Sequence, residues 1–123
     1  MFVRNIKEFK KKTNKKKIIC LDCGMKKVGI AISDENHKIS MPMETLFRNL
    51  VFYKNIIKII NDYNIGGILV GLPLGEEKKI NKMSHSIIDT TTNLDNHLNR
   101  SKLNIPFFFW DEKTCYEFMR DVC

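Results

Sequence analysis

Apolar residues follow a strand-like spacing in the first third of the chain. Residues 18–23 form a nearly continuous apolar run interrupted by one acid, Asp22, which predicts a central strand buried on both faces. In residues 28–33 apolar and small side chains alternate, which is the period of a second strand. Residues 38–41 favour a third strand that ends at Pro42.

The spacing then changes to that of amphipathic helices separated by short apolar runs. Asn64 and Gly66 follow the first helical stripe and are typical helix-end residues. In chain order the pattern predicts a helix at 52–63, a strand at 68–70, a helix at 80–98, a strand at 105–110 and a short helix at 113–123.

This order of elements predicts an α/β fold. Three strands joined by short turns, followed by alternating strands and helices, indicate a mixed five-stranded sheet with helices on both faces. A chain of 123 residues, 43% of them hydrophobic, favours a single globular domain. We expect residues 1–17 to form a basic N-terminal extension, a solvated arm, and residues 18–123 to form the domain.

The charge balance favours a polyanionic partner. The chain has 21 lysines and arginines against 14 acids, a formal net charge of +7. Lysine, asparagine and isoleucine are used heavily throughout, so a nucleotide bias of the genome explains part of this charge equally well. No stretch has the length of a membrane span and the N-terminus lacks a secretory signal. We therefore expect a cytoplasmic protein with no membrane partner.

The cysteines do not predict a zinc site. Cys20 and Cys23 have the spacing of a metal or redox pair, but residues three apart on a strand point to opposite faces. Cys115 and Cys123 lack the matching spacing of a second ligand pair. Reduced cysteines packed as small apolar side chains, as in a reducing cytoplasm, fit better.

Candidate chemistry gathers where the parallel strands end. Asp22 lies at the end of the first strand, Gly71 follows the strand at 68–70, and Asp111 and Glu112 follow the last strand. Ligands of open α/β sheets bind beyond these carboxyl ends. A buried carboxylate is costly unless it is paired or bound to metal, and Mg²⁺ favours carboxylates together with substrate phosphate. Asp22 with Asp111 or Glu112 fits part of such a site, and Asp22 fits equally well as a cap of the following turn.

Three neighbours of these acids are candidate phosphate contacts. Lys26 and Lys27 lie in the turn after Asp22, where flexible point charges can hold phosphate. Gly71 allows a backbone to approach a ligand closely. An ordinary exposed turn accounts for the lysines, and turn geometry alone accounts for the glycine.

Four segments, taken together and in order, resemble the YqgF family, also called RuvX. The segments are Leu-Asp-Cys-Gly-Met-Lys-Lys-Val-Gly-Ile-Ala-Ile-Ser-Asp at 21–34, Met-Pro-Met-Glu-Thr at 41–45, Ile-Leu-Val-Gly-Leu-Pro-Leu at 68–74 and Asp-Glu-Lys at 111–113. They span about residues 18–113. The resemblance implies a ribonuclease H-like fold similar to that of the resolvase RuvC.

The resemblance also implies a function and a site. It implies a metal-dependent nuclease that processes the end of precursor small-subunit ribosomal RNA, acting on structured RNA or branched DNA as a monomer or homodimer. Asp22 would be the first metal-binding acid and Asp111 or Glu112 the second, with Mg²⁺ or Mn²⁺ as the cofactor. The catalytic set is then Asp22, Asp111 and Glu112, the metal ligands are Asp22 and Asp111, and the nucleic-acid contacts are Lys26, Lys27, Gly71 and Lys113.

The chain departs from the family pattern at its C-terminal end. Lys113 stands where the family has arginine, which replaces a forked phosphate contact by a point charge. The family's further helix, with an Asp-Ser-Ala-like motif, has no counterpart before Cys123, so we expect a C-terminally short domain. A catalytically inactive RNA-binding module of ribosome assembly therefore stands beside the nuclease. A nucleotide-binding protein of the sugar-kinase and actin type would need a second domain, for which the chain is too short.

Overall fold

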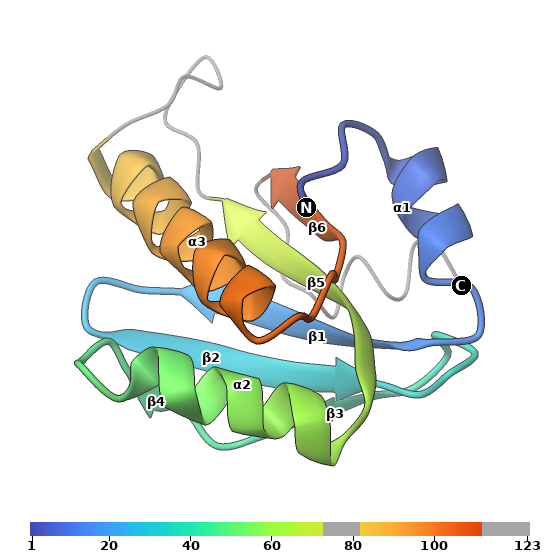
Figure 1. Cartoon of the computed structure of the whole chain (residues 1–123), viewed down its shortest axis with the longest axis horizontal. Helices are drawn as coiled ribbons and strands as arrows, with labels where there is room; N and C mark the ends of the chain where they lie inside the picture. The colour runs from blue at the N-terminus through green and yellow to red at the C-terminus, as the bar shows by residue number, and fades with distance from the viewer. Residues whose placement is uncertain (73–81, 112–123) are drawn as a thin grey trace.

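The sheet and its helices are defined in a computed structural model, which describes residues 1–72 and 82–111. Its strands form one mixed sheet in the order β3-β2-β1-β5-β6, and β4 pairs with β2 (Figure 1). The elements in chain order are α1 (Ile6–Lys12), β1 (Lys17–Cys23), β2 (Lys27–Ser33), β3 (Ser40–Pro42), β4 (Leu46–Phe47), α2 (Phe52–Asp62), β5 (Ile65–Leu72), α3 (Lys82–Arg100) and β6 (Phe107–Asp111).

The topology confirms the predicted fold class. β1 and β2 form an antiparallel hairpin, whereas β5 joins β1 and β6 joins β5 in parallel. Helices α2 and α3 lie over one face of the sheet, and α1 packs on the other (Figure 1). Over residues 1–72 and 82–111 the sheet has six strands, where the pattern predicts five. The additional strand, β4, has two residues, which is too short to produce a readable alternation.

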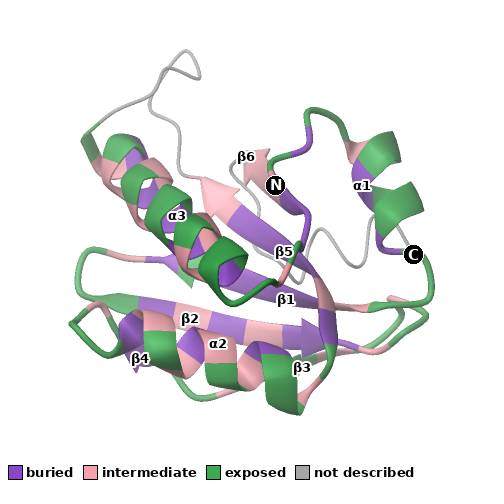
Figure 2. Cartoon of the chain, viewed as in Figure 1, coloured by how far each residue is buried: buried purple, intermediate pink, exposed green. Residues whose placement is uncertain are grey.

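Alternation along β1 divides the core into two layers. Ile19 and Leu21 pack in the large cluster under α2 and α3, and Cys23 belongs to the same cluster. Ile18 and Cys20 pack in the smaller cluster with α1. Figure 2 shows the resulting buried stripes along the central strands. The two cysteines therefore lie on opposite faces, as the sequence predicts, and do not form a metal pair with each other.

The two long helices follow the predicted apolar stripes. Phe52, Ile56 and Ile60 are buried on α2, and α3 buries its own stripe of residues, which includes Leu94. Asn64 follows α2 with a φ of 53°, the left-handed conformation that ends helices. The predicted helix ends are thus confirmed at Asn64 but not at Gly66, which lies inside β5.

Two predicted strand bounds are wrong for identifiable reasons. β3 begins at Ser40 because the backbone amides of Lys38 and Ile39 donate hydrogen bonds to the Asp34 carboxylate, at 2.7 and 3.1 Å. Those amides are therefore unavailable to the strand ladder. Pro42 is included in β3, which is tolerated because β3 is an edge strand.

β5 begins three residues earlier than its apolar run suggests, because glycines allow a close approach there. A Cβ atom added to Gly67 would lie 2.4 Å from Cγ2 of Thr13, and one added to Gly66 would lie 2.6 Å from Cβ of Lys16. Glycine at these positions lets the chain after α1 pack directly on the strand. A reading of side-chain pattern alone takes such glycines as breaks.

The lysine-rich lead-in is folded against the sheet. Phe9 of α1 is fully buried, whereas Lys10, Lys11 and Lys12 in the last helical turn are exposed. The N-terminal strand segment bridges β6, where the Val3 amide donates to the Phe107 carbonyl at 2.8 Å. The expected solvated arm is thus wrong in part, because Val3, Phe9 and Thr13 are buried while the lysines stay exposed. The division of the chain at residue 17 stays a prediction.

Over the described ranges, no helix is long and apolar enough to cross a membrane.

We expect Gly67→Ala to destabilise the fold through this contact. The added methyl group collides with the Thr13 side chain, which is buried and hydrogen-bonded to the Phe9 carbonyl, so the free energy of unfolding should fall by about 1–3 kcal/mol. Thr13→Ser removes Cγ2 and keeps the hydroxyl. In urea unfolding, the double variant should recover part of the loss, as a positive coupling. Strictly additive losses would contradict the contact.

The turn before β3 gives the stability a pH dependence. The hydrogen bond from the Ile39 amide is the main cause that lowers the pKa of Asp34 below its ordinary value of 3.8. The charge-dependent stabilisation is therefore fully present above that value and is lost as the pH falls through the folded-state pKa. We expect Asp34→Ala to cost about 1 kcal/mol at neutral pH.

Asp34→Asn keeps an acceptor oxygen and removes the charge, so it isolates the electrostatic part. Urea unfolding of wild type and Asp34→Asn should differ at neutral pH and converge on acidification. A difference that is constant down to the acid limit would show that the carboxylate charge plays no part.

Candidate functional site

Asp22 lies at the carboxyl end of β1 and is exposed to solvent. It occupies the strand face of Ile18 and Cys20, opposite the layer of α2 and α3. The sequence predicts a buried carboxylate at this position, and this prediction is wrong. The cost of burying an unpaired charge therefore does not apply, and Asp22 is open to a ligand.

Glycines on both neighbouring strands explain this exposure. Asp22 pairs with Gly29 of β2 on one side and with Gly71 of β5 on the other. A Cβ atom on Gly29 would lie 3.7 Å from Cβ of Asp22, and no other side chain of the described residues lies within 4 Å of it. At the paired position of each neighbouring strand, Asp22 thus has a glycine and no side chain beside it. Trp110 of β6 pairs with Gly71 and continues the same row.

The end of β6, which carries the second candidate acid, lies at the same edge of the sheet as the end of β1. Asp111 is the last residue of β6 and pairs with Leu72, one step beyond the row of Asp22, with β5 between the two acids. Glu112 and Lys113 lie outside the described residues. The backbone therefore brings the strand ends together as predicted, whereas the meeting of the two carboxylates stays a prediction.

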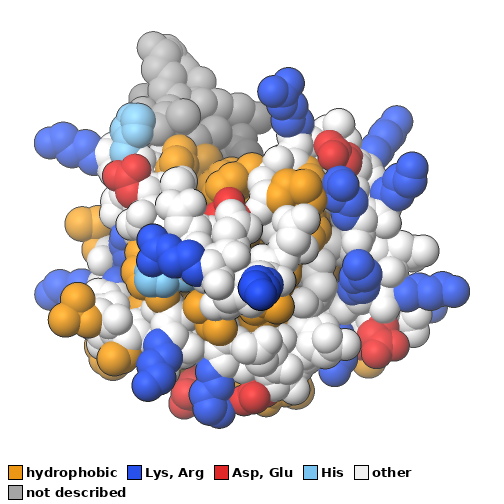
Figure 3. All heavy atoms as spheres, viewed as in Figure 1, with side chains coloured by type: hydrophobic (Ala, Val, Ile, Leu, Met, Phe, Trp, Pro, Cys, Tyr) orange, Lys and Arg blue, Asp and Glu red, His pale blue; other side chains and the backbone are white. Residues whose placement is uncertain are grey.

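The lysines of the hairpin lie close to Asp22 in sequence and are exposed. Lys26 is in the turn between β1 and β2, and Lys27 is the first residue of β2. The Lys27 Nζ atom lies 5.3 Å from the centre of the Phe47 ring on β4. Both positions suit contact with a phosphate backbone. In Figure 3 basic side chains are spread around the helix-covered face, so the net charge of +7 does not by itself locate a site.

Arg48 lies beside the turn that follows Asp22, and the sequence analysis did not identify it. Its guanidinium donates hydrogen bonds to the Gly24 carbonyl at 2.9 Å, to Ser86 Oγ at 2.8 Å and to Thr90 Oγ1 at 2.7 Å. Its backbone amide donates to the Lys26 carbonyl at 2.8 Å. Arg48 therefore joins the turn after Asp22 to helix α3. No sequence pattern reveals it, because its side-chain partners lie 23 to 42 positions away.

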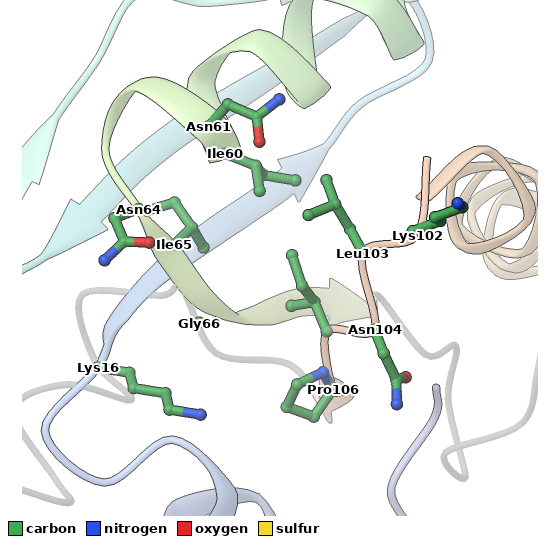
Figure 4. A pocket seen from close by; sticks show the side chains of 11 residues that line it. Lys16, Ile60, Asn61, Asn64, Ile65, Gly66, Lys102, Leu103, Asn104 and Pro106 are labelled. Atoms are coloured by element: carbon green, nitrogen blue, oxygen red, sulfur yellow. The ribbon is translucent and has the colours of Figure 1, made fainter. Parts of the chain in front are cut away.

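Two of the pockets formed by the described residues lie away from this edge. One pocket of about 330 Å³ opens at the amino ends of β5 and β6, between Lys16, Asn64 and Lys102 (Figure 4). A second, of about 550 Å³, lies beside α2 and includes Tyr53, whose ring stacks on His97. The described part of the chain holds no group of three or more His, Cys, Asp or Glu residues arranged for a metal ion. A cation at Asp22 would therefore take its further ligands from a second acid at the end of β6, from water or from the substrate.

Comparison with known proteins gives a consistent result. A sequence model described as "RuvX: Holliday junction resolvase" matches residues 16–116. A "Putative pre-16S rRNA nuclease" of Pelagibacter ubique (strain HTCC1062) is 33% identical over 111 residues, which cover 88% of this chain and 70% of that protein. A protein of the same name from Orientia tsutsugamushi (strain Ikeda) is 36% identical over 115 residues, with 92% and 70% covered. A solved chain of Archaeoglobus fulgidus Pelota aligns with a TM-score of 0.43 and 10% identity over 91% of this chain and 32% of that one, which is too weak a likeness to carry an argument.

We expect Arg48→Ala to destabilise the hairpin edge. The change leaves the acceptors of the turn and of α3, among them the Gly24 carbonyl and Ser86 Oγ, without their guanidinium donor, so the free energy of unfolding should fall by about 1–3 kcal/mol. Arg48→Lys keeps the charge but not the fork, and should recover only part of the loss. Urea unfolding with amide hydrogen exchange of the 24–27 turn tests this. An Arg48→Ala protein with wild-type stability and exchange would contradict the bridging role.

Proposed function

The chain belongs to the RuvX family, and we propose that it is a divalent-metal-dependent nuclease that processes the end of precursor small-subunit ribosomal RNA in the cytoplasm. The names of its relatives and the exposed carboxylate at the carboxyl edge of the sheet support this proposal. The observation that carries it is the placement of Asp22 between two glycines, where the surface is open to a bulky polyanion.

Asp22 suits a hard divalent cation. Its carboxylate is exposed, so it can bind a cation without first breaking a buried ion pair. Mg²⁺ or Mn²⁺ is commonly held by one or two carboxylates together with water and substrate phosphate. This fits a site in which Asp22 supplies one ligand and the substrate completes the coordination shell of the cation. We assign the second acid to Asp111 or Glu112. When bound, the metal would supply charge stabilisation at the phosphodiester that is cut.

The remaining residues hold and orient the nucleic-acid backbone. Lys26 and Lys27 are exposed at the hairpin turn, which begins two residues after Asp22, and they can neutralise phosphates. Arg48 fixes the backbone of that hairpin against α3, which limits the positions that the two lysines can take. Gly71 has no side chain, so it leaves room for the nucleic-acid backbone beside Asp22. Lys113 is the further phosphate contact that we propose beyond β6.

A branched DNA junction is the second candidate substrate, because the family description names a Holliday junction resolvase. Both substrates present the same phosphodiester to Asp22, and the protein fold alone does not distinguish them. A panel that contains precursor ribosomal RNA and a four-way DNA junction separates the two by rate.

We expect Asp22→Asn to abolish cleavage and to leave binding intact. Loss of the charged ligand should lower the rate of metal-dependent cleavage by about 100-fold or more, because charge stabilisation at the reacting phosphate is removed. Labelled precursor RNA and the DNA junction are incubated with and without Mg²⁺. Asp89→Asn, an exposed acid on α3, is the matched control and should cleave as wild type does.

Equal cleavage by wild type and Asp22→Asn would overturn the assignment of Asp22. Salt-sensitive RNA binding by wild type with no Mg²⁺-dependent cleavage of any substrate would instead identify a non-catalytic ribosome-assembly module.

A further inference from the structure

Phe47 is an exposed aromatic residue on the same sheet face as Asp22. It pairs with Lys27 across β4 and β2, and its neighbour Leu46 pairs with Val28 and is buried under the helices. Paired residues share a face and successive residues alternate, so Phe47 and Lys27 point away from the helix layer. Gly29, two residues after Lys27, lies on this same face and directly beside Asp22.

The backbone that carries Phe47 is fixed on both sides. Leu46 is anchored in the core, and the Arg48 amide and guanidinium bond to the carbonyls of the hairpin turn. Even so, the Phe47 side chain is 59% exposed. A single exposed apolar residue needs no explanation. Here, however, the backbone that carries the ring is anchored and the Lys27 ammonium lies over the ring, 5.3 Å from its centre, so an exposed apolar ring and a positive charge stand together.

The distance from this ring to Asp22 is short. By strand rise and spacing, Lys27 lies about 7 Å further along the sheet than Gly29, and β4 lies two strand positions from β1. The backbone of Phe47 is therefore on the order of 12 Å from that of Asp22. A nucleic-acid strand bound at the aromatic ring would reach the Asp22 carboxylate within a few nucleotides.

We propose that Phe47 is a stacking platform for an unpaired nucleobase, with Lys26 and Lys27 on the flanking phosphates, so that a single-stranded segment of the substrate is led to Asp22. Every base has a π face, so such a platform binds without sequence preference, and lysines beside it supply the charge complement of the backbone. A base inside a duplex is already stacked and cannot cover the ring. The inference rests on the proposed function for the direction of the strand toward Asp22, and it selects an unpaired segment as the part of the substrate that is recognised.

The test measures binding of fluorescent oligonucleotides to the full chain without divalent cation, so that cleavage plays no part. Phe47→Ala should weaken binding of a single-stranded RNA by about fivefold or more and leave binding of the matching duplex unchanged. Phe47→Trp should keep single-strand affinity at the wild-type level, and bound RNA should quench the indole fluorescence that this variant has in addition to that of Trp110. Leu50→Ala is the matched control, since Leu50 is fully exposed and has no strand partner, and it should bind as wild type does.

Salt dependence separates the ring from the charges. Lys27→Ala should reduce the slope of log affinity against log salt by about 0.7, because one phosphate contact is lost. Phe47→Ala should lower the affinity at every salt concentration and keep the slope of wild type. Because the side chains of Phe47 and Lys27 are both exposed, both variants should unfold close to the wild-type urea midpoint.

Equal single-strand affinity of wild type and Phe47→Ala would overturn the platform. It would also be overturned if Phe47→Ala lost binding to phosphatidylserine vesicles and kept binding to RNA, since the ring would then serve a lipid surface. Failure of the nuclease proposal has a different signature: no cleavage that depends on Asp22, whatever Phe47 binds.

Discussion

The parallel pairing of β1 with β5 is the constraint on which the site depends. Its register sets Asp22 against Gly71, and the β1–β2 hairpin sets Gly29 on the other side. A residue with a side chain at either neighbouring position would stand beside the carboxylate. The open surface around Asp22 is therefore a property of three strands at once, and it follows from register more than from the identity of Asp22.

The edge near Asp22 is held by long-range polar contacts as well as by the core. Arg48 joins the hairpin turn to two hydroxyl side chains of α3, and its backbone amide completes the link at Lys26. These contacts keep the hairpin lysines and the Phe47 ring on a fixed frame while their side chains stay exposed. A preorganised edge of this kind binds a flexible polyanion without ordering the protein first, which favours affinity.

The sequence predicted an element correctly where the spacing of apolar residues within that element alone shows which of its faces is buried. The alternation in β1 and β2 and the stripes of α2 and α3 are readable because each buries one face against a neighbouring layer. It failed where the reason lies in another element. β4 is too short to show a period, and Gly66 and Gly67 are strand residues only because Thr13 and Lys16 pack against them. Likewise, the exposure of Asp22 depends on glycines from other strands, and Arg48 acts through α3. The ordered motifs identified the family correctly, whereas the proposed second acid, Asp111 or Glu112, lies at the limit of the described residues and stays a prediction.

The most direct test of the central claim is Mn²⁺ titration of the isotope-labelled protein, followed by paramagnetic broadening of its amide resonances. If a divalent cation binds at the carboxyl edge, substoichiometric Mn²⁺ should first broaden the amides of Asp22, Gly29 and Gly71, and Asp22→Asn should abolish this effect. Broadening that begins elsewhere, such as around the Lys58–Asp62 pair of α2, or that is unchanged in Asp22→Asn, would contradict the account.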